Sequence, residues 1–282
     1  MKSKVLVAYN GADSGLGNRV RVVLGAKVLA EHERRELFYV WPTGKLFGPK
    51  FTDLWNFSGG VRISRSMSRV IAPLWPYETE DVREPSETRV RQIRTGSELR
   101  LPDSLRSWRQ EFRDMAPAEE ITERVETFFN AHLKGRPYVG VQVRAHQVSH
   151  QKTKDASPVS WFERRMRDIA TQQPEIAFFV SADVPEVVAH LQDVIPNVFG
   201  LRDKGGYNTT KGVKSAVTDL DLLASSGYLL GAHASSFRHL AAYLADERLK
   251  IETSQDEAPP EVLLPSGGNV LDATRPAQRE PV

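Results

Sequence analysis

The chain lacks several features that would define its class. It has no cysteine among its 282 residues, which excludes a disulfide framework, a zinc–thiolate centre and catalysis by a cysteine. No stretch approaches the ~20 consecutive apolar residues of a membrane span. The amino terminus has no apolar segment with a cleavage site of the secretory kind. These absences favour a cytoplasmic protein without a membrane span.

Neither sign of charge is in large excess. The 38 lysines and arginines face 36 aspartates and glutamates, and the net charge of +2 is dispersed along the chain. This distribution does not favour nucleic acid as a partner. Hydrophobic residues make up 40% of the chain, as in ordinary globular proteins. The sequence has no internal repeat, and its length suffices for two domains of ~100–200 residues each.

The first part of the chain begins as an α/β unit. The pattern predicts a strand over 4–9, a helix over 18–31 and a strand over 37–41. Residues 43–118 are rich in arginine, proline, glycine and tryptophan, and they are too many for one loop. We expect short helices and strands with long connections there. Such a surface suits substrate binding, and the alternative is a merely irregular half of the domain.

The later part of the chain is regular. A helix is predicted over 118–133, and the Lys134–Pro137 segment ends it and marks the best candidate for a domain boundary. Alternating strands and helices then favour a parallel sheet with helices on both faces. They are predicted over 138–144, 160–172, 177–181, 185–194, 197–201, 214–226, 228–231 and 236–245. The expected organisation is an N-terminal α/β domain over 1–134, a Rossmann-like domain over 135–250 and a tail over 251–282.

A glycine turn joins the first strand to the first helix. It contains Gly15, Gly17, Asn18 and Arg19. Glycines let the backbone approach a ligand, and the free N–H groups of a helix's first turn favour anions. The turn lacks the lysine of a P-loop and the third glycine of a dinucleotide fingerprint. The pattern therefore predicts an anion site, with an ordinary turn as the alternative.

Two charged residues follow predicted buried strands. Arg144 comes after the strand at 138–143, and Asp183 after the strand at 177–181. Ligands of open parallel sheets bind at the carboxyl ends of the strands, and a guanidinium fork matches a diphosphate. The alternatives are an Arg144 that only forms a salt bridge at the sheet end and an Asp183 that caps the next helix.

A third segment combines an acidic helix, a buried strand and a turn of small residues. Asp219 lies in the helix, and Ser235 and Ser236 lie at the start of the helix after the turn. The serine hydroxyls and the free N–H groups there suit a diphosphate. The alternative is that one serine is an ordinary N-cap.

These segments, in this order, resemble the fucosyltransferase superfamily, which includes the alpha-1,6-, nodulation-type and protein O-fucosyltransferases. The opening family motif is matched by Ser14–Arg19, and the motif with the essential arginine by Val141–Ala145. The strand-end motif is matched by Phe179–Pro185 with Asp183 retained, and the last motif by Asp219 with Ser235-Ser236. The resemblance covers most of residues 1–31 and 138–245.

The resemblance implies a fold and an activity. The fold is two facing Rossmann-like domains in the GT-B arrangement, with the active-site cleft between them. The activity is inverting transfer from a GDP-sugar, with GDP-fucose as the expected donor, without a metal or any other cofactor. The acceptor would be a glycan, a lipid-linked glycan or a small molecule. Gln142 replaces the family's histidine, which helps to hold the guanine nucleotide, and the resemblance therefore implies a nucleotide-binding role for Gln142. Ala145 replaces the family's second basic residue.

Transfer from a nucleoside diphosphate sugar needs donors to the leaving diphosphate. No Asp-x-Asp motif ends a strand, since Asp219 and Asp221 lie in a predicted helix. Arg144, Ser235 and Ser236 would therefore replace a metal, and Asp219 would bind the base. Asp13 is the candidate general base. The alternatives are His146 and His150, which lie in the polar segment after Arg144.

Two other functions stay open. One is a nucleotide-sugar-binding protein of the same fold without transferase activity, for which Gln142 and Ala145 would be the signs of decay. The other is an unrelated α/β enzyme with a phosphate-containing substrate.

Overall fold

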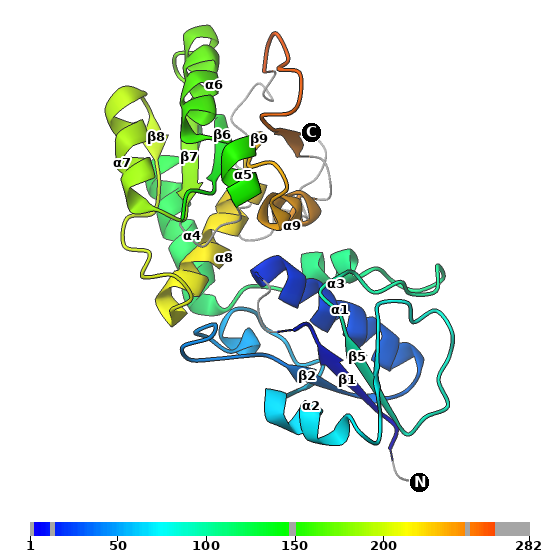
Figure 1. The fold of residues 1–282 in the computed structure, drawn as a ribbon. Coiled ribbons are helices and arrows are strands. Elements are labelled where there is room, and N and C mark those ends of the chain that lie inside the picture. The colour runs from blue at the N-terminus through cyan, green and yellow to red at the C-terminus, as the bar shows by residue number, and fades with distance from the viewer. Residues whose placement is uncertain (1–2, 12–14, 147–150, 246–248, 263–282) are drawn as a thin grey trace. The chain divides into compact units, whose positions relative to one another are not determined.

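The computed structural model describes residues 3–11, 15–146, 151–245 and 249–262. The chain forms two compact units (Figure 1). The first unit spans Met1–Ala118 with Asn208–Thr210, and the second spans Glu119–Tyr207 with Lys211–Val282. Within the described residues, no helix is both long enough and apolar enough to cross a membrane.

The first unit is built on a five-stranded parallel sheet in the order β3-β2-β1-β5-β4. Its strands are β1 (Val5–Tyr9), β2 (Glu36–Val40), β3 (Val61–Ile63), β4 (Tyr77–Glu78) and β5 (Val90–Arg94). The central strand β1 is apolar and buried from Leu6 to Tyr9, as expected of a parallel strand covered on both faces.

Helices cover both faces of this sheet. On one face α1 (Leu16–His32) packs against β1 and β2 and against α3 (Trp108–Asp114). On the other face α2 (Arg65–Ile71) contacts β1 (Figure 1). A short helix, η1 (Phe51–Asp53), carries Phe51 into an aromatic cluster with Trp41 and Trp55. Residues 43–118 thus consist of short elements with long connections, as the sequence predicted.

The second unit repeats this plan with a parallel sheet in the order β10-β9-β6-β7-β8. Its strands are β6 (Tyr138–Val143), β7 (Ala177–Ala182), β8 (Val198–Phe199), β9 (Tyr228–Gly231) and β10 (Lys250–Glu252). Its helices are α4 (Glu119–His132), α5 (Gln151–Ala156), α6 (Val159–Gln172), α7 (Pro185–Val194), α8 (Thr210–Ala224) and α9 (Ser236–Leu244).

Alternate residues of the second sheet face two different helical layers. One face forms an apolar core with α6 and α7, to which β6 contributes Val139, Val141 and Val143. On the other face Phe179 of β7 contacts Phe128 of α4. A side chain at Gly140 would meet Leu223 and Ser226 from α8 and the turn after it. The predicted doubly wound α/β arrangement is therefore confirmed.

The structure differs from the sequence prediction in three segments. The polar segment predicted as a loop over 145–154 contains the start of α5, because its lysines and glutamine are good helix formers. The tail predicted from 251 begins inside a strand, since β10 pairs with β9. The helix α4 belongs to the second unit, whereas the sequence placed the boundary after it. Its Phe128 and Phe129 contact Phe179 and Tyr138 of the second sheet.

Candidate active site

The carboxyl ends of β6, β7 and β9 place the predicted residues of the second unit. From β6 the chain continues to β7 and β8 on one side, and then crosses to β9 and β10 on the other. Ligands of open α/β sheets bind where the strand order reverses in this way. Arg144, Asp183 and Ser235 follow the ends of β6, β7 and β9, so they lie at one edge of the sheet.

Asp183 organises the turn after β6. Its Oδ1 accepts hydrogen bonds from the backbone N–H groups of Ala145, at 2.7 Å, and His146, at 3.0 Å. Its Oδ2 lies 3.3 Å from Nη1 of Arg144. The Arg144 side chain remains 33% exposed, whereas the Asp183 side chain is 12% exposed. The carboxylate therefore orients a guanidinium that still faces solvent.

This arrangement decides between the alternatives for the two residues. The interpretation of Asp183 as a helix cap is wrong, because the N-cap of α7 is Val184 and makes no side-chain cap bond. Arg144 does form the salt bridge that was the alternative prediction, and its partner is Asp183. A guanidinium has five N–H donors, so this ion pair leaves donors for a second anion.

Gln142 lies next to this turn but is 2% exposed. Its Oε1 and its backbone oxygen both lie near the N–H of Ala232, at 3.3 and 3.1 Å. The side chain thereby ties the end of β6 to the turn after β9. This contact gives Gln142 a structural role in addition to the nucleotide-binding role predicted for it.

Asp219 is part of a buried network rather than an exposed acceptor. It is 1% exposed, and its Oδ2 accepts a 2.7 Å hydrogen bond from the hydroxyl of Ser181 in β7. The ammonium of Lys204 forms an ion pair with the same oxygen and donates a 2.8 Å bond to the backbone oxygen of Ala182. Among described residues Oδ1 of Asp219 is buried without a hydrogen-bond partner.

The second carboxylate of this helix has a different environment. Asp221 is 2% exposed, and burial alone raises its pKa well above the usual 3.8. Asp219 and Asp221 therefore do not share a partner. In the described part of the chain, no three side chains of the histidine, aspartate and glutamate types gather as metal ligands would.

The turn after β9 leads into α9 with a left-handed residue, Ala234, at φ 58°. Ser235 occupies the N-cap position and Ser236 is the first helical residue. The alternative of an ordinary cap is not what the structure shows, because the Ser235 side chain makes no cap hydrogen bond. Ser235 is 7% exposed and Ser236 is exposed. The first turn of α9 thus keeps donors for a ligand.

The glycine turn of the first unit begins α1 as predicted. Gly15 is the N-cap with φ −69°, and a Cβ there would meet no described atom within 4 Å. Gly17 and Arg19 are buried, and Asn18 is partly exposed. Nη1 of Arg19 lies 3.3 Å from Oδ1 of Asn10. The same guanidinium stacks on the ring of Phe47 at 4.4 Å.

The candidate bases are only partly described. Asp13 and His150 lie outside the described residues. The ring of His146 stacks on Tyr207 at 4.9 Å with an angle of 11° between the rings. A role for any of them as the general base stays a prediction.

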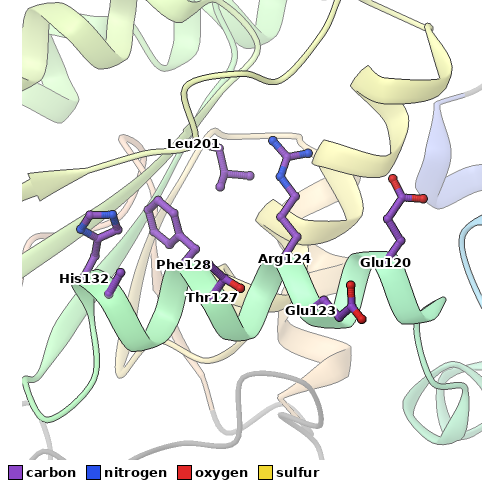
Figure 2. Close-up of a pocket in the computed structure, with 8 residues that line it drawn as sticks. Glu120, Glu123, Arg124, Thr127, Phe128, His132 and Leu201 are labelled. Carbon is purple, nitrogen blue, oxygen red and sulfur yellow. The ribbon is translucent and has the colours of Figure 1, made fainter.

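A shallow pocket of about 480 Å³ lies elsewhere in the second unit, along α4 (Figure 2). Arg124, Phe128 and His132 project from this helix towards Leu201. Arg124 already donates hydrogen bonds to the Ser215 hydroxyl and to the Asp203 backbone oxygen. None of the predicted site residues lines this pocket.

No family model matches the chain, and no curated protein matches it in sequence. Solved structures do match. The alpha-1,6-fucosyltransferase NodZ soaked with GDP-fucose aligns with a TM-score of 0.61 at 18% identity, over 86% of this chain and 92% of that one. The fold is that of the fucosyltransferases.

Two further structures extend this likeness. NodZ from Bradyrhizobium in selenomethionine form aligns at 17% identity with a TM-score of 0.61, over 86% of this chain and 92% of that one. POFUT1 in complex with GDP aligns at 11% identity with a TM-score of 0.57, over 91% of this chain and 100% of that one. The resemblance based on short motifs is thereby confirmed at the level of the fold.

Two cationic residues near the predicted site escaped the sequence analysis. Lys204 lies in a polar, glycine-containing loop, and nothing in the local pattern points to its partner Asp219. Arg238 lies in the first turn of α9, where a Cβ at Gly231 would touch its Cδ. Burial lowers the pKa of Arg238, although the charge of Asp256 opposes this effect. The position of Arg238 two residues after Ser236 in the sequence could have identified it as a candidate site residue.

Proposed function

We propose that the chain is an inverting, metal-independent glycosyltransferase that takes a GDP-sugar, with GDP-fucose as the donor, to a hydroxyl acceptor. The observation that supports this most directly is Arg144. It is oriented by Asp183 at the end of the central strand, next to the strand that leads into α9. The likeness to fucosyltransferase folds supports the same assignment.

The proposed chemistry follows from where charge develops. As the bond to the anomeric carbon breaks, negative charge grows on the leaving diphosphate and the sugar becomes oxocarbenium-like. Arg144, the hydroxyl groups of Ser235 and Ser236, and the N–H groups in the first turn of α9 supply donors to that charge without a metal. Asp183 acts as a positioning residue, because it fixes the guanidinium and the turn behind it.

The second unit binds the nucleotide, with Gln142 and Asp219 beside the base. The first unit binds the acceptor, and Gly15, Gly17, Asn18 and Arg19 approach the sugar diphosphate. Asp13 serves as the general base. The acceptor is a glycan, a lipid-linked glycan or a small molecule, and the reaction takes place in the cytoplasm.

Calorimetry in EDTA tests the donor site. We expect GDP to bind, UDP to bind at least ~10-fold more weakly, and Mg²⁺ to change neither value. Binding of GDP that appears only with a divalent metal would overturn metal independence. A preference for UDP would overturn the guanine assignment.

The second candidate is a nucleotide-sugar-binding protein without transferase activity. It is favoured by Gln142, whose side-chain oxygen lies close to the N–H of Ala232 and so serves the fold. GDP release from GDP-fucose, measured with and without a panel of hydroxyl acceptors, separates the two candidates. Acceptor-dependent release supports the transferase, and tight GDP binding without release supports the binding protein.

A further inference from the structure

Two arginines of the first unit surround one tyrosine at the carboxyl edge of the sheet. Tyr9 ends β1, Arg94 ends β5, and Arg65 begins α2 directly after β3. The guanidinium of Arg94 lies 5.1 Å from the centre of the Tyr9 ring, and that of Arg65 lies 6.0 Å from it. Three segments that are distant in sequence thus place two positive charges around one ring.

The sheet register explains why these side chains share a face. Tyr9 and Arg94 are direct partners in the parallel pairing of β1 and β5. Paired residues of parallel strands point to the same side of the sheet. Tyr77 of β4 lies on that side too, with its ring 5.7 Å from the Arg94 guanidinium and 6.3 Å from the Tyr9 ring.

The two guanidiniums have no carboxylate partner among the described residues. The acidic side chains around them have other partners. Glu78 pairs with Arg91, Asp81 pairs with Arg83, and Glu80 accepts a 3.1 Å hydrogen bond from the Thr95 hydroxyl. Arg65 is partly buried and Arg94 is exposed, so an anion that reaches this edge of the sheet could interact with both guanidiniums.

Buried polar atoms point to the same conclusion. Tyr9 is 2% exposed, and its hydroxyl is buried without a hydrogen-bond partner in the described part of the chain. Nε of Arg65 is also buried without a hydrogen-bond partner among the described residues. A buried donor without a partner is unfavourable, so such groups normally have a partner in the functional state of a protein.

From this cluster, which we call the Arg65–Arg94 site, we infer a binding site for a phosphate group of the acceptor. A phosphate monoester carries a charge of about −1.5 to −2 near pH 7, which matches two guanidiniums, whereas a carboxylate would neutralise one. Its oxygens accept bidentate hydrogen bonds from arginine and one from a tyrosine hydroxyl. The link to the acceptor rests on the proposed transferase function, but the anion site does not.

Titration with inorganic phosphate tests the site directly. The full chain is titrated by calorimetry at constant ionic strength, with GDP at saturation so that the proposed donor site is filled. We expect phosphate to bind the wild type. Arg65→Gln and Arg94→Gln should each weaken binding by ~10-fold or more, and Tyr9→Phe by several-fold.

The matched control is Arg62→Gln. Arg62 lies in the same segment, but its guanidinium donates to the backbone oxygen of Trp41 at 2.9 Å and to the Thr43 hydroxyl at 3.0 Å. Its substitution should leave phosphate binding unchanged. Unchanged binding in Arg94→Gln, or loss of phosphate binding when GDP is added, would overturn the inference. Acetate should bind more weakly than phosphate in the same titration. Equal or tighter binding of acetate would overturn the assignment of the site to a phosphate group.

A second measurement concerns the acceptor and separates the two proposals. The transfer rate is measured with one glycan acceptor, with and without a terminal phosphate. Arg94→Gln should raise the KM of the phosphorylated acceptor ~10-fold and leave that of the plain acceptor unchanged. Equal changes for both would overturn the acceptor assignment. If GDP does not bind at all, the transferase proposal fails, while the phosphate titration still decides the anion site.

Discussion

The two sheets share part of their strand order but differ in the charges at their carboxyl edges. In each sheet the first strand is central and the next two strands lie in order on one side. The last two strands lie on the other side in opposite orders, β5 then β4 in the first sheet and β9 then β10 in the second. In the second unit two cations at this edge are paired, Arg144 with Asp183 and Lys204 with Asp219. In the first unit Arg65 and Arg94 have no carboxylate partner within the described residues.

The pairing of a cation determines whether it has a fixed place in the fold or can bind a ligand. A paired and buried cation such as Lys204, with its side chain 15% exposed, is held in one place by the fold. A cation without an anion is stable only where water or a ligand balances it. The second unit therefore presents a fixed set of donors, and the first unit presents positive charge to a ligand that brings its own negative charge.

The largest expected effect comes from breaking the buried pair. Lys204→Met leaves the Asp219 carboxylate buried without its cation, which should lower the free energy of unfolding by about 3–5 kcal/mol in urea denaturation. Lys211→Met is the control, because Lys211 pairs with Asp203 at the surface and should change stability by about 0–1 kcal/mol. Equal effects of the two substitutions would remove the contrast between buried and exposed pairs.

The second prediction concerns the rate of sugar transfer in variants of Arg144. Arg144→Ala should lower kcat by ~100-fold or more, about 3 kcal/mol, because the leaving diphosphate loses a donor. Arg144→Lys should restore little, since it keeps the charge but not the fork. Arg167→Ala, in which only an exposed pair with Glu163 is lost, is the control. Near-normal turnover of Arg144→Ala would assign the leaving-group role to another residue.

The third prediction tests whether the glycine turn of the first unit contacts the donor. A Cβ at Gly15 meets no described atom, so Gly15→Ala should leave the Tm unchanged and raise the donor KM ~10-fold if backbone and ligand are in close contact. Gly140→Ala is the contrast. Its Cβ would lie 2.9 Å from the Ser226 hydroxyl oxygen, so it should lower the Tm. An unchanged donor KM in Gly15→Ala would make the glycine turn structural.

The smallest expected effect is a pH dependence due to Asp221. Burial raises its pKa in the folded state above 3.8, so the folded state binds this proton more tightly than the unfolded state. The resulting stabilisation is complete below pH 3.8 and is lost as the pH rises through the folded-state pKa. Asp221→Asn should remove this loss and raise the Tm more at pH 8 than at pH 4. An equal change at both pH values would contradict it.

Much of the fold was predictable because its signals are local. The buried strands Val5–Tyr9, Tyr138–Val143 and Ala177–Ala182 are nearly continuous apolar runs between polar turns. Such runs are typical of parallel strands that are covered on both faces. The elements that were missed are short or polar. The helix Gln151–Ala156 has no apolar periodicity, and the strand Lys250–Glu252 has only three residues.

The candidate site was predictable only in part. The position of Arg144 after a buried strand places it at the carboxyl edge of the sheet whatever its partners are. The partners themselves lie far away in sequence. Asp183 reaches back to the backbone of Ala145, 38 residues earlier, and Lys204 finds Asp219 across the loop before α8. No pattern within one segment contains that information.

The sequence alone predicts the order of most strands and helices, the position of Arg144, Asp183 and Ser235 at strand ends, and the likeness to the fucosyltransferases. The pairing of the charges is visible only in the folded structure. Apolar patterning and turn chemistry are local properties of a segment. The partner of a charge depends on how strands align across the sheet, as Tyr9 and Arg94 do across 85 residues of chain.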